Sequence, residues 1–249
     1  MSLLKIKNLL KTFGGVKAID NCSFNIKESI ITALIGPNGS GKTTLFNLVS
    51  GLIKADSGKI IFDNVDITNK SPEFISNLGI SRAFQQSQLF DNLTLEENLL
   101  LAFNNEDTKF FKNLFNFHKI TEEEKEKIHY YLKMINLERH LHHLAREFSY
   151  GQRKLIELIR AILNPHKLLM LDEPVAGVNP QLRNKIIDIL LGLKEKEETI
   201  LLIEHDMYFT FNIADYIIVL DKGKPIAEGT PQEIKENQKV LQVYLGEYR

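Results

Sequence analysis

The sequence predicts an α/β fold with an inserted helical segment, and three patterns support this class. Apolar and polar residues alternate through parts of the first thirty positions, as expected for antiparallel strands. Apolar runs at residues 30–35, 168–171 and 200–203 are each followed directly by polar or glycine-rich residues, which is typical of buried strands. Between about residues 93 and 162 these strand patterns disappear, and amphipathic helices are expected instead.

We therefore expect a single domain over residues 1–249 that has two parts. Residues 1–85 and 164–249 are expected to form an α/β core that begins with an antiparallel β subdomain. Residues 86–163 are expected to form an α-helical subdomain inserted into that core. With 43% apolar and 25% charged residues, a chain of this length can bury a large core.

Composition also limits the partners and the compartment. The formal net charge of −1 argues against DNA or RNA as a partner, because proteins that follow phosphate backbones usually carry a basic excess. The single cysteine, Cys22, has no internal disulfide partner, which favours a reducing compartment. Lysines interrupt the apolar residues near the N-terminus and no long apolar run follows, so neither a signal peptide nor a membrane span is expected. We expect a cytoplasmic protein that reaches a membrane only through a partner.

A glycine-rich loop follows the first of the three apolar runs, and a helix is expected directly after it. The loop fits the pattern G-x-x-x-x-G-K-[ST] of phosphate-binding loops. Its residues are Gly36, Pro37, Asn38, Gly39, Ser40, Gly41, Lys42 and Thr43. Glycines let such a loop curve so that its backbone N–H groups and the positive end of the helix dipole surround a polyphosphate. The sequence therefore predicts a nucleotide site in a P-loop NTPase core.

The end of the loop carries the groups expected to contact phosphate and metal. Lys42 adds a full positive charge that is expected to reach the β- and γ-phosphates. The hydroxyl of Thr43 is expected to be a ligand of Mg²⁺, and Thr44 offers a second hydroxyl nearby.

Phe13 precedes the glycine pair Gly14-Gly15 between two expected strands. Spacing alone leaves two interpretations open: the ring stacks on a purine base, or it packs into the core.

Polar residues also follow other expected strands and open an expected helix. Asp172 and Glu173 follow a buried strand downstream of the loop, where one acid can hold Mg²⁺ and the other can activate water. His205 follows the next apolar strand, within possible reach of a γ-phosphate. Gln85 follows a short strand and can present its amide to a metal or to an attacking water. Ser149 is expected at or beside a helix N-cap, where free N–H groups can hold an anion.

The remaining strands and helices are predicted from the spacing of apolar residues and from the residue types that typically begin or end such elements. Strands are expected at residues 59–62 and 216–220, and helices at residues 72–78, 94–102, 122–135, 152–163, 181–193 and 233–246. The segment 109–117 concentrates four phenylalanines, Phe110, Phe111, Phe115 and Phe117. These rings belong either to the core of the helical subdomain or to an apolar surface that docks a membrane partner, and both interpretations stay open.

With these motifs in order, the chain resembles the ATP-binding subunit of an ABC transporter along its whole length. The resemblance implies an ATPase with ATP and Mg²⁺ as cofactors. Phe13 would stack on adenine, and residues 36–43 would be the Walker A loop. Thr43, Gln85 and Asp172 would hold Mg²⁺.

The same resemblance assigns the chemistry and a partner site. Glu173 would be the general base, His205 the switch histidine and Gln85 the Q-loop glutamine. The signature sequence would comprise Ser149, Tyr150, Gly151 and Gln152. In this family two cassettes pack head to tail, so that the signature of one covers the ATP held by the other.

The expected partners follow from that arrangement. They are a second cassette, identical or paralogous, two integral membrane permeases and, indirectly, a solute-binding protein. The chain would then lie on the inner face of the cell membrane as a peripheral subunit.

Departures from the general ABC sequence pattern indicate which subfamily of cassettes the chain resembles. Tyr150 replaces the usual first glycine of the signature, and Asn179 replaces the aspartate of the D-loop. Both variants look like the larger, LivG-type cassette of branched-chain amino-acid importers, as do residues 203–207, 227–231 and 244–247. Cassettes for urea or short amides and for lipopolysaccharide export share parts of this set, so a cassette for urea, short amides or another solute is the alternative.

Two other classes fit less well. Ribosome-directed ABC proteins carry two cassettes in one chain and DNA-repair members are interrupted by coiled coils, whereas this chain holds one uninterrupted cassette. A small GTPase needs Asn-Lys-x-Asp, and the segment Asn69-Lys70-Ser71-Pro72 lacks the aspartate.

Overall fold

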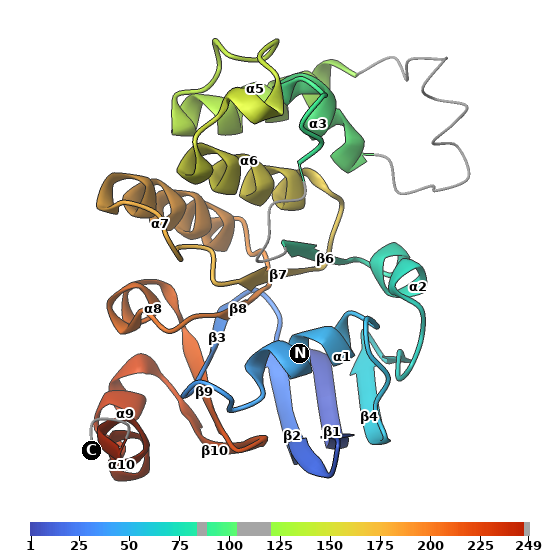
Figure 1. The fold of residues 1–249 in the computed structure, drawn as a ribbon, viewed down its shortest axis with the longest axis vertical. Helices are drawn as coiled ribbons and strands as arrows, with labels where there is room; N and C mark the ends of the chain where they lie inside the picture. The colour runs from blue at the N-terminus through green and yellow to red at the C-terminus, as the bar shows by residue number, and fades with distance from the viewer. Residues whose placement is uncertain (84–88, 104–120, 247–249) are drawn as a thin grey trace.

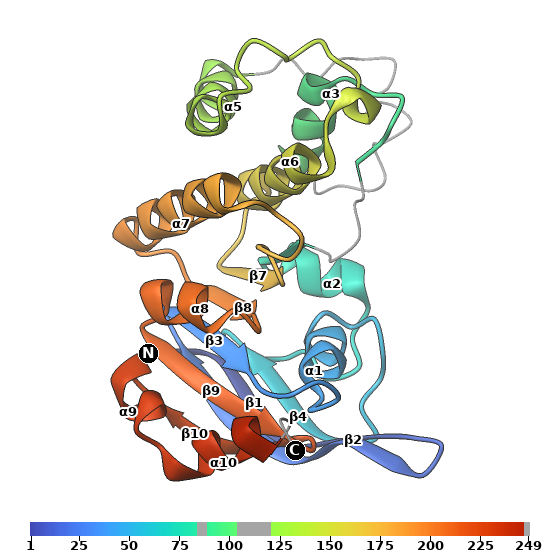
Figure 2. The same ribbon diagram turned by 60° about the vertical axis from the view of Figure 1, so that its left-hand side comes forward.

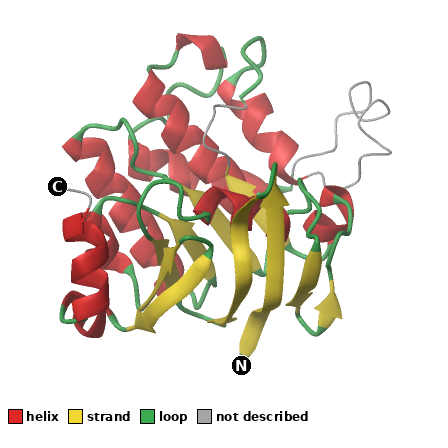
Figure 3. Cartoon of the chain, turned by 60° about the horizontal axis from the view of Figure 1, so that its bottom comes forward, coloured by secondary structure: helices red, strands yellow, loops and turns green. Residues whose placement is uncertain are grey.

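The computed structural model describes residues 1–83, 89–103 and 121–246. Strands form two sheets, and helices surround the larger sheet (Figures 1 and 3). Gln85 and the phenylalanine-rich segment 109–117 lie outside the described residues. Among the helices of the described ranges, none is both long and apolar enough to cross a lipid bilayer.

The smaller sheet is antiparallel and has the order β2-β1-β4-β5. Its strands are β1 (Ser2–Phe13), β2 (Val16–Lys27), β4 (Ser57–Phe62) and β5 (Val65–Asp66). Leu4 lies opposite Ile26 and Ile6 opposite Phe24, so the apolar side chains of the alternating segments share one buried face. The predicted antiparallel β subdomain is confirmed.

The larger sheet has the order β10-β9-β3-β8-β7-β6. Its strands are β3 (Ile31–Ile35), β6 (Ile80–Ala83), β7 (Leu168–Asp172), β8 (Ile200–Ile203), β9 (Tyr216–Asp221) and β10 (Lys224–Gly229). All pairs are parallel except β9 with β10. Every residue of β3, β7 and β8 is buried, because helices or the smaller sheet cover both faces.

The helices begin mostly at side-chain caps. They are α1 (Lys42–Val49), α2 (Pro72–Asn77), α3 (Leu95–Leu100), α5 (Glu122–Ile135), α6 (Tyr150–Leu163), α7 (Pro180–Glu195), α8 (Met207–Ile213), α9 (Pro231–Lys235) and α10 (Gln238–Gly246), with short 3₁₀ turns η1 (Leu101–Phe103) and η3 (Ala145–Glu147). Thr94, Thr121, Ser149 and Thr230 each form a capping box with the residue three positions later.

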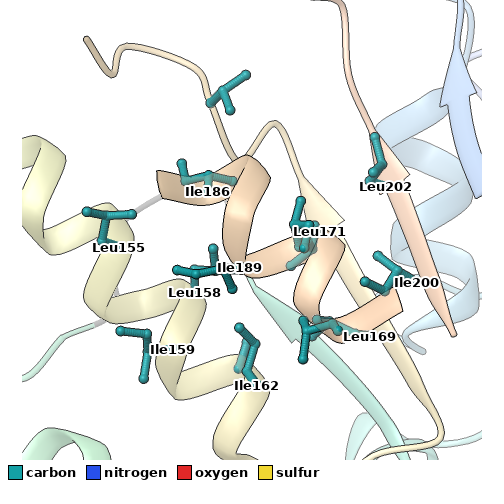
Figure 4. Close-up of a cluster of buried hydrophobic side chains, with 14 of the residues drawn as sticks. Leu155, Leu158, Ile159, Ile162, Leu169, Leu171, Ile186, Ile189, Ile200 and Leu202 are labelled. Atoms are coloured by element: carbon teal, nitrogen blue, oxygen red, sulfur yellow. The ribbon is translucent and has the colours of Figure 1, made fainter. Parts of the chain in front are cut away.

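The helical region packs onto the sheet through α7. Figure 4 shows Leu158 of α6 beside Ile189 of α7, with residues of β7 and β8 on the other side of α7. The side chains concerned are buried, and burying one leucine or isoleucine completely contributes about 1.5–3 kcal/mol. In Figures 1 and 2, α3 and α5 lie beyond α6, farther from the larger sheet.

Several expected helix bounds differ from the structure. Helix α6 begins at Tyr150 rather than at residue 152, and α7 spans Pro180–Glu195 rather than 181–193. The helix expected over 233–246 is two helices: α9 ends at Lys235, and the side chain of Asn237 accepts from the N–H groups of Lys239 and Val240, which starts α10 anew. The helix expected over 94–102 ends at Leu100 and tightens into η1.

Candidate functional site

The sheet order brings the predicted polar residues to one edge. Strand β8 lies between β3 and β7, and all three run parallel. Their carboxyl ends therefore lie side by side. The glycine-rich loop follows β3, Asp172 ends β7 with Glu173 directly after it, and His205 follows β8. This edge is the candidate site.

In the glycine-rich loop between β3 and α1, two positions require glycine because a Cβ atom there would clash with a neighbouring backbone carbonyl. A Cβ on Gly36 would lie 2.0 Å from the carbonyl oxygen of Leu220, and one on Gly41 would lie 2.4 Å from that of Ala18. Both residues also have positive φ angles, 150° and 105°. The loop is thus pressed between the end of β9 and strand β2.

One hydrogen bond fixes the loop to the turn between β9 and β10, and a second fixes that turn to β2. The N–H of Gly223, in the turn between β9 and β10, donates to the carbonyl of Ser40 at 2.8 Å. The N–H of Asp20 in β2 donates to the carbonyl of Gly223 at 3.1 Å. The curved backbone is therefore formed before any phosphate binds, which lowers the ordering cost of binding.

Lys42 is buried and lies along the loop. Its Nζ donates to the carbonyl oxygens of Gly36 at 2.7 Å and Pro37 at 3.0 Å. The Oγ of Ser40 is buried and has no hydrogen-bond partner among the described residues. Asn38, Gly39 and Thr43 are exposed, and Thr44 is half-buried. The loop thus presents open backbone and hydroxyl groups beside a cation, which suits an anion.

Asp172 forms a buried ion pair that the sequence analysis did not anticipate. Its Oδ2 accepts from a terminal nitrogen of Arg82 on β6 at 3.0 Å, and the two side chains are only 2% and 7% exposed. Arg82 also donates to Asn47 of α1 and to Ser50, the C-cap residue of α1, each at 2.8 Å. Burial raises the pKa of Asp172, and the Arg82 guanidinium opposes part of that rise.

Glu173 and His205 lie together, as the sequence predicts for adjacent strand ends. The Nδ1 atom of His205 is 3.7 Å from Oε1 of Glu173. The N–H of Glu173 donates to the carbonyl of Ile203 at 3.0 Å, which aligns the two strand ends. Glu173 has a φ of 50°, so its backbone is in the left-handed region. The imidazole is 61% exposed and therefore open to a ligand.

Glu204, directly before His205, is a second residue that the sequence analysis passed over. Its side chain is 0% exposed. An acid immediately after the apolar run 200–203 was the available signal, but exposed acids after strands are common and the signal alone does not reveal burial.

The predicted signature residues open helix α6. Ser149 is its N-cap, and its Oγ accepts from the N–H of Gln152 at 3.4 Å, which confirms the expected cap. Helix α6 and helix α1 lie apart in Figures 1 and 2, with β6 and β7 between them in Figure 1. The structure thus does not bring α6 to the glycine-rich loop of its own chain.

The start of α6 instead packs on the segment before α7 and on α7 itself. A Cβ on Gly151 would lie 2.4 Å from Cδ1 of Leu182, and one on Gly177 would lie 3.1 Å from a ring carbon of Tyr150. Asn179 caps α7 through a 2.9 Å bond from the N–H of Leu182. The signature and the D-loop segment are therefore in direct contact.

Phe13 is not a core residue. Its side chain is 48% exposed at the end of β1, and Nζ of Lys11 lies 5.1 Å from its ring centroid. The core interpretation is wrong, and the stacking interpretation stays a prediction.

Comparison with known protein families agrees with this arrangement. Residues 19–176 match the model of a family described as ABC transporter. Residues 224–249 match a second model, described as branched-chain amino acid ATP-binding cassette transporter.

Curated relatives match the chain over nearly its full length. A probable branched-chain amino acid transport ATP-binding protein LivG of Archaeoglobus fulgidus is 41% identical over 247 residues, which covers 99% of this chain and 96% of the relative. The high-affinity branched-chain amino acid transport ATP-binding protein LivG of Escherichia coli K12 is 36% identical over 250 residues, with 98% of each chain covered.

Solved structures show the same fold. A nucleotide-free ATP-binding cassette from an ABC transporter superposes with a TM-score of 0.82 at 39% identity, over 98% of this chain and 99% of the other. A dimeric bacterial ABC transporter cassette superposes with a TM-score of 0.76 at 28% identity, over 92% of this chain and 98% of the other.

Proposed function

The chain belongs to the ABC transporter family, and on this premise we propose that it is the ATP-hydrolysing subunit of an importer for branched-chain amino acids. The observation that carries the proposal is the meeting of the glycine-rich loop, the Asp172-Glu173 pair and His205 at one edge of the sheet. The names of the relatives and the match at residues 224–249 support the choice of solute.

The loop and its flanks are proposed to bind ATP. Backbone N–H groups of residues 36–43 surround the phosphates, and Lys42 leaves the loop carbonyls to contact the β- and γ-phosphates. Asn38, Ser40 and Thr44 add polar groups to the same cradle. Phe13 stacks on adenine through its exposed face.

The residues at the site fit Mg²⁺, because hydroxyl, carboxylate and amide oxygens are its preferred ligands. Thr43, Asp172 and Gln85 would hold the ion, with Asp172 using the carboxylate oxygen that Arg82 does not bind. The ion would neutralise charge on the phosphates during transfer.

Glu173 and His205 are proposed to act on the reacting groups. Glu173 accepts the proton of the attacking water, and His205 contacts the γ-phosphate through its exposed imidazole. Gln85 orients the water, although the structure does not describe that residue.

Ser149, Tyr150, Gly151 and Gln152 are proposed to cover the ATP of a second cassette, identical or paralogous. The solved dimeric cassette to which this chain is similar supports such a pairing. Two permease subunits would hold the pair at the inner face of the membrane, and a solute-binding protein would act on the permeases.

The test uses the complete transporter in lipid vesicles, assembled from this chain, its permeases and its binding protein. ATPase activity should rise when the binding protein is loaded with leucine, isoleucine or valine. The empty binding protein is the control. Stimulation by urea or a short amide alone would overturn the choice of solute and leave the ATPase intact, whereas a complex without ATPase activity would overturn the whole proposal.

A further inference from the structure

The candidate site contains a buried carboxylate to which the proposed mechanism gives no role. We propose that Glu204 is a positioning residue that fixes Glu173 and His205 relative to each other. This inference rests on the proposed function, because it assigns Glu204 a part in the same ATPase site.

One carboxylate bridges two segments of the chain. Its Oε1 accepts from the N–H of Val175 at 3.2 Å. Its Oε2 accepts from the N–H groups of His205 at 3.0 Å and Asp206 at 3.2 Å. Val175 is two residues beyond Glu173, so the bridge joins the backbone that carries the proposed base to the backbone that carries the histidine.

The Glu173 side of the bridge needs such an anchor. Glu173 has a φ of 50°, a conformation that a non-glycine residue keeps only where its surroundings enforce it. The bond from Glu173 N–H to Ile203 holds one side of this residue, and the bond from Val175 to Glu204 holds the other.

The His205 side is held by further contacts. The Oδ1 atom of Asp206 accepts from the N–H of Phe209 at 2.9 Å and so caps α8, while its Oδ2 pairs with Arg183 of α7 at 2.8 Å. The imidazole Nδ1 lies 3.9 Å from Oε2 of Glu204 and 3.7 Å from Oε1 of Glu173. The ring thus lies close to both carboxylates.

Packing alone does not account for an acid at this position. A fully buried carboxylate costs solvation free energy, and an apolar side chain would fill the same space without that cost. Burial accordingly raises the pKa of Glu204, while the three backbone N–H groups act in the opposite direction. A carboxylate can accept hydrogen bonds from backbone N–H groups with both of its oxygens.

Glu204→Gln tests this bridge with almost no change in volume. A glutamine has one acceptor oxygen, so its NH₂ group must face N–H donors on one side of the bridge. Glu173 and His205 should then lose their fixed separation, while the glycine-rich loop, held by Gly223 and Asp20, stays in place.

Steady-state ATP hydrolysis by the full-length protein is the first measurement. We expect kcat to fall about 10-fold or more with KM for ATP changed less than about 2-fold, because misplacing a catalytic group affects the chemical step. Glu204→Asp should also lose kcat, since its side chain keeps the charge but is one methylene too short to bridge both segments. It serves as the second variant if the amide variant does not fold.

Asp215→Asn is the matched control. Asp215 accepts from the backbone N–H of Ile31 at 2.9 Å and pairs with Lys194. It directly precedes β9, at the amino-terminal ends of the parallel strands, whereas the candidate site lies at their carboxyl ends. Its replacement by the amide should keep kcat.

Amide hydrogen exchange is the second measurement. In Glu204→Gln, peptides spanning 173–179 and 204–207 should exchange faster, and the peptide spanning 36–43 should not change. An unchanged kcat would overturn the inference, as would parallel losses in kcat, ATP affinity and protection of residues 36–43. A wild-type protein without ATPase activity would instead overturn the proposed function itself, and this inference with it.

Discussion

At the scale of single residues, the site depends on side chains whose neighbours are distant in sequence. Glu173 and His205 are 3.7 Å apart although more than thirty positions separate them in the chain. Strand β8 next to β7 creates that proximity. The order of strands in the sheet therefore brings together the two residues that we propose as base, Glu173, and as contact to the γ-phosphate, His205.

Glu173→Gln should lower kcat by about 10²- to 10⁴-fold while ATP still binds, because the amide cannot accept the proton of water. Phosphate release and binding of a fluorescent ATP analogue measure the two effects separately. Glu122→Gln, an exposed residue at the start of α5, is the control and should behave as wild type. Hydrolysis at the wild-type rate in Glu173→Gln would refute this role.

Local sequence predicts some site residues well and others not at all. The positions of the glycine-rich loop, Asp172 and Ser149 can be predicted because each belongs to a pattern with a fixed relation to one strand or helix. The roles of Arg82 and Glu204 cannot be predicted in this way, because they depend on distant elements that bury the charged side chain and supply its partners.

At the scale of elements, Arg82 connects three of them. It lies on β6, pairs with Asp172 on β7, and donates to Asn47 of α1 and to the C-cap residue Ser50. The ring of Phe46 of α1 lies beneath its guanidinium. The helix that follows the glycine-rich loop is thus attached to the strand that carries the acids.

Arg82→Met should lower the free energy of unfolding by about 3–5 kcal/mol, because it leaves the Asp172 carboxylate buried without its cation. Urea unfolding measures the loss. Adding Asp172→Asn should restore part of it, since the uncompensated charge is then removed.

Lys59→Met is the control for the Arg82 variant. Lys59 pairs with Asp66 at 3.8 Å, and the two side chains are 66% and 50% exposed, so the loss should stay below about 1 kcal/mol. Equal losses at Lys59 and Arg82 would show that burial does not set the strength of the Arg82–Asp172 pair.

Element type was predictable where periodicity is strong, and element ends were less so. The alternation in β1 and β2 and the apolar runs of β3, β7 and β8 predict those strands directly. The break between α9 and α10 was missed because Asn237 is compatible with a continuing helix, and only its side-chain bonds to Lys239 and Val240 reveal a new start.

At the scale of the whole molecule, the order of strands in the sheets is set by contacts between distant segments. Residues 80–83 pair with residues 168–171, which lie far away along the chain. No local pattern specifies such a pairing, so the fold class was predictable from the sequence but strand order was not.

The Glu173→Gln protein should sediment as a monomer without nucleotide and as a dimer with ATP and Mg²⁺. The reason is that α6 lies away from the glycine-rich loop of its own chain, so that the proposed contact of Ser149 with ATP requires a second chain, and slow hydrolysis preserves that state. Analytical ultracentrifugation measures the change, with Lys42→Ala as the control that should not dimerise. A monomer at high ATP and high protein concentration would count against the head-to-tail pair.

The close packing of Gly151 on Leu182 and of Tyr150 on Gly177 has a consequence for such a pair. The residues that we propose to touch the neighbour's nucleotide cannot shift without displacing the segment that leads back to Glu173 of their own chain. Occupancy of one site then changes the free energy of occupying the other, and the coupling is equal in both directions. Because each chain's Ser149 is proposed to close on the ATP of the other, the coupling is expected to favour the second ATP. Binding of ATP to the Glu173→Gln pair should then be sigmoidal, with a Hill coefficient above one.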